Sequence, residues 1–147
     1  MKKFSFRLET LLKHRNNIEE RERTRFSGIR GELAAEVDHL RTLQTRQAQT
    51  LADLVLLKTG PYDPQDISWH YLYLSRLSRQ MEQSSKRIVD LEARLETQRQ
   101  AMIDATRDAK MIANLKRKKA KEFLVELERN EQKMIDEMIV IRHGAKP

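Results

Sequence analysis

Hydrophobic residues recur every three to four positions along two long stretches of the chain, which is the pattern of amphipathic helices. The later stretch is the more regular of the two. From Leu74 to Ile112 its core positions follow alternating steps of three and four residues, and only Ser84 and Gln98 are polar. This seven-residue period predicts a coiled coil with a left-handed supercoil.

The earlier stretch keeps the same period from Phe26 to Leu57, with more interruptions. Its remaining core positions are polar: Glu36, Gln47 and Thr50. Polar residues at core positions cost stability, and they fix the register or mark where a third surface docks. Gly28 and Gly31 lie inside this pattern, where glycine weakens a helix by about 1 kcal/mol relative to alanine. They indicate a local bend, a close approach of the second helix or a functional hinge.

Residues 59–66 separate the two stretches and hold both internal prolines. Gly60 suits the left-handed position just past a helix end, and Asp63 before Pro64 is typical of an N-cap followed by a first helical residue. Ser5 is the predicted N-cap of the first helix. A loop this short returns the second helix along the first. We therefore predict one all-α domain, 1–147: an antiparallel coiled-coil hairpin with helices at about 5–58 and 64–142 and a turn at 59–63.

The two predicted helices differ in length, at about 80 Å and about 115 Å. Folding back from the turn places Leu8 near residues 114–119, so we expect the second helix to overhang from about Ala120. The seven-residue pattern also changes register there. The new stripe consists of Ala120, Leu124, Leu127, Glu131, Met134, Met138 and Ile141, widened by Phe123, Ile135 and Ile139. A helix with an unpaired apolar stripe is marginal in water, so we expect a second copy or another protein to cover it.

Charge and composition narrow the choice of partner. Charged residues make up 35% of the chain, aromatics 5%, and the net charge is +7. This excess favours acidic partners, although acids and bases alternate nearly everywhere. The basic cluster at residues 116–121 fits a nucleic acid, an acidic protein surface or simple solvation. A nucleic-acid site usually adds stacking aromatics, and only Phe123 is near.

The sequence offers little for catalysis. There is no cysteine, and the four histidines are scattered without metal-ligand spacing. The adjacent carboxylates at 19–20 and 136–137 point about 100° apart on a helix, which makes a poor acid–base pair. We therefore predict no catalytic residue, no metal and no cofactor. No apolar run approaches the roughly 20 residues that span a bilayer, so we expect no direct membrane insertion.

Four aromatic residues gather around the turn: Tyr62, Trp69, Tyr71 and Tyr73. They either cap the end of the hairpin or form a docking patch, since aromatics are favoured at interface hot spots.

Three stretches carry a resemblance to a known family. They are FRLETLLKHR at residues 6–15, KMIANLKRK at 110–118 and ERNEQKMIDE at 128–137. Together they make the chain similar, over essentially its whole length, to the FliJ family of the bacterial flagellar type III export apparatus. The resemblance implies a cytoplasmic stalk, peripherally associated with the cytoplasmic face of the inner membrane and similar to the central subunit of rotary ATPases. The implied partners are the hexameric export ATPase ring, the export-gate membrane protein and export chaperones.

The resemblance also suggests where the partners bind. For the export ATPase we expect Arg7, Lys13, Leu127, Glu131, Gln132, Met134, Asp136 and Met138. For the export gate we expect Leu43, Tyr73 and Leu77, on the ground that they are exposed near the turn. Two alternatives stay open: a basic coiled-coil arm that binds nucleic acid, and a homodimeric structural or adaptor coiled coil.

Overall fold

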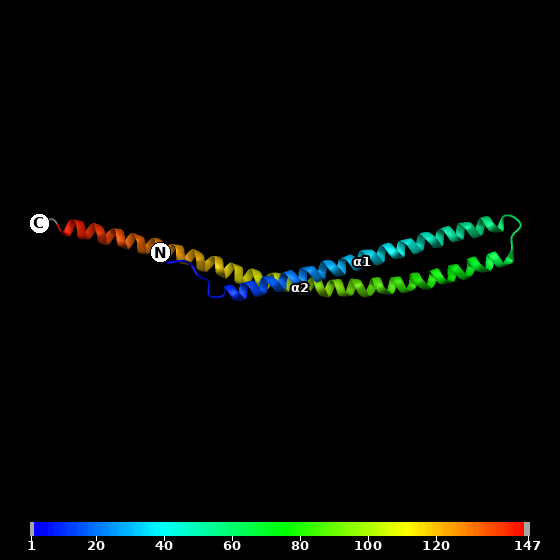
Figure 1. Ribbon diagram of the computed structural model, residues 1–147, viewed down its shortest axis with the longest axis horizontal. Helices are drawn as coiled ribbons and strands as arrows, with labels where there is room; N and C mark the ends of the chain where they lie inside the picture. The colour runs from blue at the N-terminus through cyan, green and yellow to red at the C-terminus, as the bar shows by residue number, and fades with distance from the viewer. Residues whose placement is uncertain (1, 146–147) are drawn as a thin grey trace. The chain divides into compact units, whose positions relative to one another are not determined.

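The computed structural model describes residues 2–145 and consists of two long helices and their connections (Figure 1). Helix α1 spans Glu9–Lys58 and helix α2 spans Pro64–Gly144. No strand occurs among the described residues. The predicted all-α helical hairpin is therefore confirmed. The contacts of the chain group into two units, one made of residues 22–102 and the other of residues 1–21 with 103–147.

The connection between the helices contains the predicted N-cap of α2, but α1 does not end as predicted. Asp63 Oδ1 accepts a hydrogen bond from the backbone N–H of Gln65 at 3.0 Å, which satisfies one of the first amides of α2. No glycine among residues 2–145 has a positive φ, so the predicted left-handed conformation of Gly60 is wrong. The physical reason lies at Thr59: its backbone N–H and its hydroxyl both donate to the carbonyl of Leu56, at 3.2 and 2.7 Å, and close the last turn.

In the unit of residues 22–102, the two helices pack along the predicted seam. Leu43 and Leu77 are its most buried large side chains, each 1% exposed, and Leu54 and Leu91 are also buried. Every predicted core position from Phe26 to Leu57 is buried or half-buried, as are those from Leu74 to Gln98. The seven-residue period therefore located the seam correctly in both helices.

Polar residues inside this seam find partners. The hydroxyl of Ser84, 1% exposed, donates to Glu36 Oε1 at 2.7 Å, and Gln98 Nε2 donates to the carbonyl oxygen of Glu22 at 3.1 Å and to its carboxylate. Thr50 donates to the carbonyl of Arg46 at 2.7 Å. Each cross-helix bond can form at one alignment of the helices only. The cross-helix bonds of Ser84 with Glu36 and of Gln98 with Glu22 therefore fix the register, which was one of the two roles expected for polar core positions, whereas the bond of Thr50 lies within α1.

In the second unit, the first turns of α1 lie along α2 in the opposite direction. Glu9 pairs with Lys116 at 2.7 Å and Arg15 with Asp108 at 3.5 Å, so positions ascend in one helix as they descend in the other. The buried residues here are Leu12, Ala105 and Ala109. The expected meeting of Leu8 with residues 114–119 is also found, since Leu8, Leu115 and Lys119 line one groove.

The start of the chain departs from the prediction. Helix α1 begins at Glu9, so Ser5 is not its N-cap and residues 2–6 have no regular secondary structure. Phe4 packs against Phe123 of α2, with ring centroids 5.7 Å apart and planes tilted by 50°. We name residues 3–8 the N-terminal strap. Contact with α2 holds this segment outside the helix.

The strap also shifts the point where α2 loses its partner. The residues of α2 that stay half-buried beyond Ile112 include Lys116, Ala120, Phe123 and Leu127, whereas Leu124 is 57% exposed. Phe123 packs under Phe4, whereas Leu124 of the new stripe stays exposed, as expected for an unpaired segment. From Ile112, the steps to residues 116, 120, 123 and 127 are four, four, three and four, and the two consecutive steps of four are a stutter in the seven-residue repeat. The overhang begins at residue 128 and not at Ala120.

Candidate functional site

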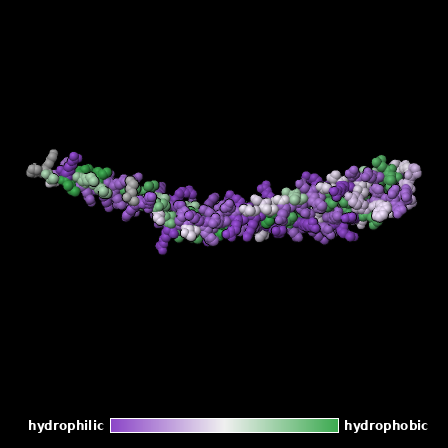
Figure 2. Space-filling view, viewed as in Figure 1, coloured by the Kyte–Doolittle hydropathy of each residue, from purple (hydrophilic) through white to green (hydrophobic). Residues whose placement is uncertain are grey.

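The last part of α2 presents an apolar stripe that no other part of residues 2–145 covers. Every residue from 128 to 145 is exposed. We name as the C-terminal stripe its large apolar residues at helical spacing: Met134, Ile135, Met138, Ile139 and Ile141. Figure 2 shows hydrophobic surface in this part of the molecule. An isolated amphipathic helix gains little stability from its apolar side while that side is in water. This stripe is therefore a candidate binding surface.

The residues predicted to bind the export ATPase divide into groups. Glu131, Met134 and Met138 lie on one side of the exposed helix, in line with half-buried Leu127. Gln132 and Asp136 lie on another side, where the Gln132 amide donates to Asp136 Oδ1 at 3.0 Å.

The two basic residues predicted for the same surface belong to the start of the chain. Arg7 is exposed in the strap and lines a groove with Phe123 and Glu126 of α2, one turn before the exposed segment. Lys13 is exposed on α1. The structure thus brings Arg7 close to the start of the exposed segment, about two turns of α2 before Met134.

Sequence reasoning missed the strap and the groove it forms. The groove is lined by Lys3, Phe4, Ser5, Phe6, Arg7 and Leu8 and by Leu115, Lys119, Glu122, Phe123 and Glu126. The signal was present, because apolar and polar residues alternate from Phe4 to Leu8, and their burial alternates in the same way. A period of two indicates an extended segment with one side covered.

The basic cluster at residues 116–121 is partly neutralised. Lys116 pairs with Glu9, and Lys119 pairs with Glu122 at 3.3 Å. Lys118 and Lys121 line a shallow hollow that also contains Glu122 and Glu126. Carboxylates beside the lysines weaken the field that a phosphate backbone would meet, so this cluster favours neither a nucleic acid nor a strong anion site.

The turn end of the hairpin carries a second apolar surface. Its exposed large side chains are Leu51, Val55, Leu56, Tyr62, Trp69, Tyr71, Leu72 and Tyr73. Lys58 Nζ donates to the Tyr71 hydroxyl at 2.8 Å and lies 5.3 Å from the centre of its ring. All of these side chains are exposed, so they do not close over the end of the hairpin.

The exposure assumed for two of the predicted gate residues is wrong. Leu43 and Leu77 are core residues of the seam, 1% exposed, because both occupy positions of the seven-residue repeat. They cannot touch a partner unless the helices separate. Tyr73, 40% exposed, is accessible. The gate role of all three residues stays a prediction.

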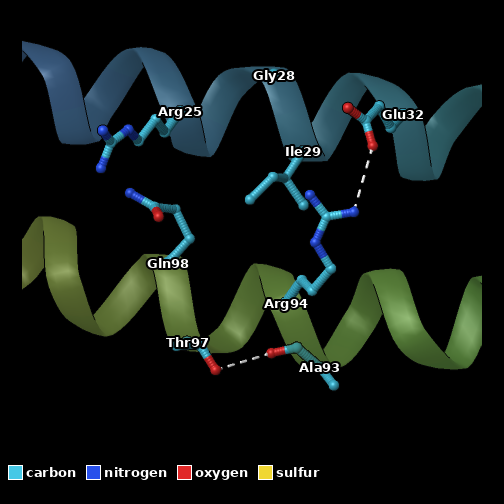
Figure 3. Close-up of a pocket in the computed structure, with 8 residues that line it drawn as sticks. All are labelled: Arg25, Gly28, Ile29, Glu32, Ala93, Arg94, Thr97 and Gln98. Carbon is cyan, nitrogen blue, oxygen red and sulfur yellow. Dashed lines mark hydrogen bonds and ion pairs between the residues drawn. The ribbon is translucent and has the colours of Figure 1, made fainter.

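A hollow between the helices opens at Gly28 (Figure 3). It is lined by Arg25, Gly28, Ile29 and Glu32 of α1 and by Ala93, Arg94, Thr97 and Gln98 of α2. A Cβ atom added at Gly28 or Gly31 would meet nothing within 4 Å, so the expected close approach of α2 at these glycines is wrong. Arg94 crosses the hollow to Glu32, 3.7 Å away.

The described part of the chain contains no group of three or more histidine, aspartate or glutamate residues placed to hold a metal ion. Two of the histidines lie beside backbone carbonyls on their own helix: His70 Nδ1 is 2.7 Å from the oxygen of Asp66, and His143 Nδ1 is 3.2 Å from that of Ile139. Neither described helix has an apolar stretch long enough to cross a membrane.

These features define a class first: a helical hairpin with exposed apolar side chains at its turn end and along the last part of α2. The family follows from comparison with known proteins. The model of the flagellar FliJ protein family matches residues 4–147, and the chain belongs to this family. It is therefore a component of the flagellar protein export apparatus, in a family of structural export components. No curated protein and no solved structure gives a significant match.

Proposed function

We propose that this chain is a non-enzymatic stalk of the flagellar export apparatus, and that the C-terminal stripe of α2 binds the export ATPase ring. The observation that carries the proposal is the complete exposure of residues 128–145, which include the stripe. A helix that enters a groove or ring contributes apolar anchors at i, i+4 and i+7. Met134, Met138 and Ile141 have this spacing.

The side of the helix that carries the anchors also identifies a matched control. Met138 and Val140 are exposed to similar extents, 62% and 68%, but they point to nearly opposite sides of α2. Replacing an anchor with aspartate removes apolar area and places a charge in the interface. The same change at Val140 adds the charge outside it.

The experiment measures binding of the full chain to the purified export ATPase by calorimetry. We expect Met134→Asp with Met138→Asp to weaken binding at least tenfold, and Val140→Asp to leave it within about twofold. Circular dichroism checks that each variant keeps its helix. If the double variant binds as the original chain does, the stripe is not the ATPase site.

A homodimer is a competing occupant of the stripe. Sedimentation of the free chain at tens of micromolar separates the two possibilities. A monomer that binds the ATPase supports the proposal. A dimer that the double variant dissociates without any change in ATPase binding contradicts it.

The rest of the proposed role concerns partners beyond the ATPase. We infer that the turn end of the hairpin reaches the export gate, that export chaperones are handled on the same protein, and that the chain acts at the cytoplasmic face of the inner membrane. Exposed Tyr73 supports a contact at the turn end. Loss of gate binding in Tyr73→Asp, with ATPase binding retained, is the expected result in a pull-down with the gate's soluble domain.

A further inference from the structure

We propose that the turn end of the hairpin binds the surface of an anionic lipid bilayer directly. The surface concerned is the outer side of the first turns of α2, which we name the tip face: Trp69, Leu72, Tyr73, Arg76 and Arg79. All five line one shallow hollow. The proposed binding of the C-terminal stripe to the ATPase does not depend on this surface, which shares Tyr73 with the gate contact inferred above.

The spacing places these side chains together, away from the seam. Trp69, Leu72, Arg76 and Arg79 follow steps of three, four and three, which is one side of a helix. Leu77, 1% exposed, faces α1, whereas Trp69 and Leu72 are each 63% exposed. Large apolar side chains therefore stand in solvent where no part of the described chain covers them.

The chemistry of the tip face favours lipid over a polar protein surface. Tryptophan and tyrosine combine an apolar ring with a polar tip and gather at the boundary between headgroups and acyl chains. An interfacial helix of this kind has aromatic and leucine residues beside basic ones.

The two arginines of the tip face are not paired with acids of the described chain. Residues 67–81 contain no aspartate or glutamate. The other long acid-free stretch of α2 is 109–121, where Lys116 and Lys119 pair with Glu9 and Glu122. Within residues 2–145, neither Arg76 nor Arg79 forms an ion pair. Further along α2, ion pairs engage every one of the next four arginines: Arg87, Arg94, Arg99 and Arg107. Two unpaired guanidinium groups beside exposed aromatics complement lipid phosphates.

The order of residues along α2 fits the depth of a headgroup layer. At 1.5 Å per residue, Arg76 and Arg79 lie about 6 Å and about 10 Å from Leu72 along the axis. One headgroup layer is roughly 5–8 Å thick. With α2 along the bilayer normal and Leu72 at the edge of the hydrocarbon, Arg76 lies within the headgroup layer. Arg79 lies just beyond it, and its long side chain leans back toward the phosphates, so neither charge is buried. This contact needs no membrane-spanning helix. The expectation of no membrane insertion then concerns the hydrocarbon core and not the headgroup layer.

The chain carries its own reporter, because Trp69 is its single tryptophan. The experiment mixes the full chain with vesicles of equal parts phosphatidylglycerol and phosphatidylcholine, and with vesicles of phosphatidylcholine alone. We expect co-sedimentation with the anionic vesicles, weakening as salt rises, and a blue shift of the tryptophan emission on binding.

Two variants of the tip face are compared with matched controls elsewhere. Leu72→Asp is expected to weaken vesicle binding at least tenfold, and Val89→Asp, at a residue that is also 63% exposed, is expected to leave it unchanged. Arg76→Glu with Arg79→Glu is expected to weaken binding by about 25-fold or more, at about fivefold per arginine. Lys118→Glu with Lys121→Glu tests the basic cluster and is expected to have a small effect.

Three results would each overturn the proposal. The first is no binding to anionic vesicles at low salt, which would leave a protein as the partner of the tip face. The second is binding without a change in Trp69 emission. The third is binding that depends on Lys118 and Lys121 and survives both tip-face changes.

Discussion

At Gly28, helix α1 lacks a side chain at a position where a Cβ atom would touch nothing. Gly28→Ala is therefore expected to raise the free energy of unfolding by about 1 kcal/mol, because alanine lowers the entropy of the unfolded chain and favours the helix. Urea unfolding followed by circular dichroism measures the change. The reverse substitution at an exposed site of α1, Ala34→Gly, serves as control and is expected to lower it by a similar amount. A loss of stability in Gly28→Ala would mean that the hollow has to stay open.

Single residues also show where sequence reasoning reached its limit. Ser84 and Gln98 were recognisable as core positions from spacing alone, but their partners Glu36 and Glu22 depend on how the two helices align. Leu43 was assigned to a docking surface although its heptad position already indicated the seam. Exposure near a turn is decided by helical phase, and the phase was readable from the sequence.

Among the elements, the N-terminal strap makes the contact that the sequence pattern did not predict. Phe4→Ala is expected to release the strap and to increase hydrogen exchange in residues 115–127, because the aromatic pair with Phe123 is lost. Such a pair contributes about 0.5–1.5 kcal/mol beyond its buried area. Mass spectrometry of exchanged peptides measures the effect, with peptides near Leu91 as internal control. Unchanged exchange at residues 115–127 would show that the strap does not protect α2.

The elements were otherwise predictable to the extent that their pattern repeats. The period of seven located both helices and the seam from Phe26 to Ile112, since many positions support the same phase, and the prolines with Asp63 located the turn. The pattern failed where only a few positions define the phase of the repeat, at the start of α1 and at the register change after Lys116. There a contact between distant residues, Phe4 with Phe123, outweighs local preference. The candidate sites lie in these less regular regions, so their residues were harder to assign.

For the whole molecule, we expect the exposed C-terminal segment to contribute to partner binding and not to stability. A chain that ends at Asn130 loses residues 131–145, all of them exposed, and the two residues that follow, so its free energy of unfolding is expected to stay within about 0.5 kcal/mol of the full chain. A chain without residues 1–8 loses Phe4, Phe6 and Leu8, which are half-buried, and is expected to be less stable by about 1–3 kcal/mol. Urea unfolding of the three chains tests both statements. If the chain ending at Asn130 were less stable than the full chain, residues 131–145 would be packed against the protein, and the C-terminal stripe would not be available to a partner.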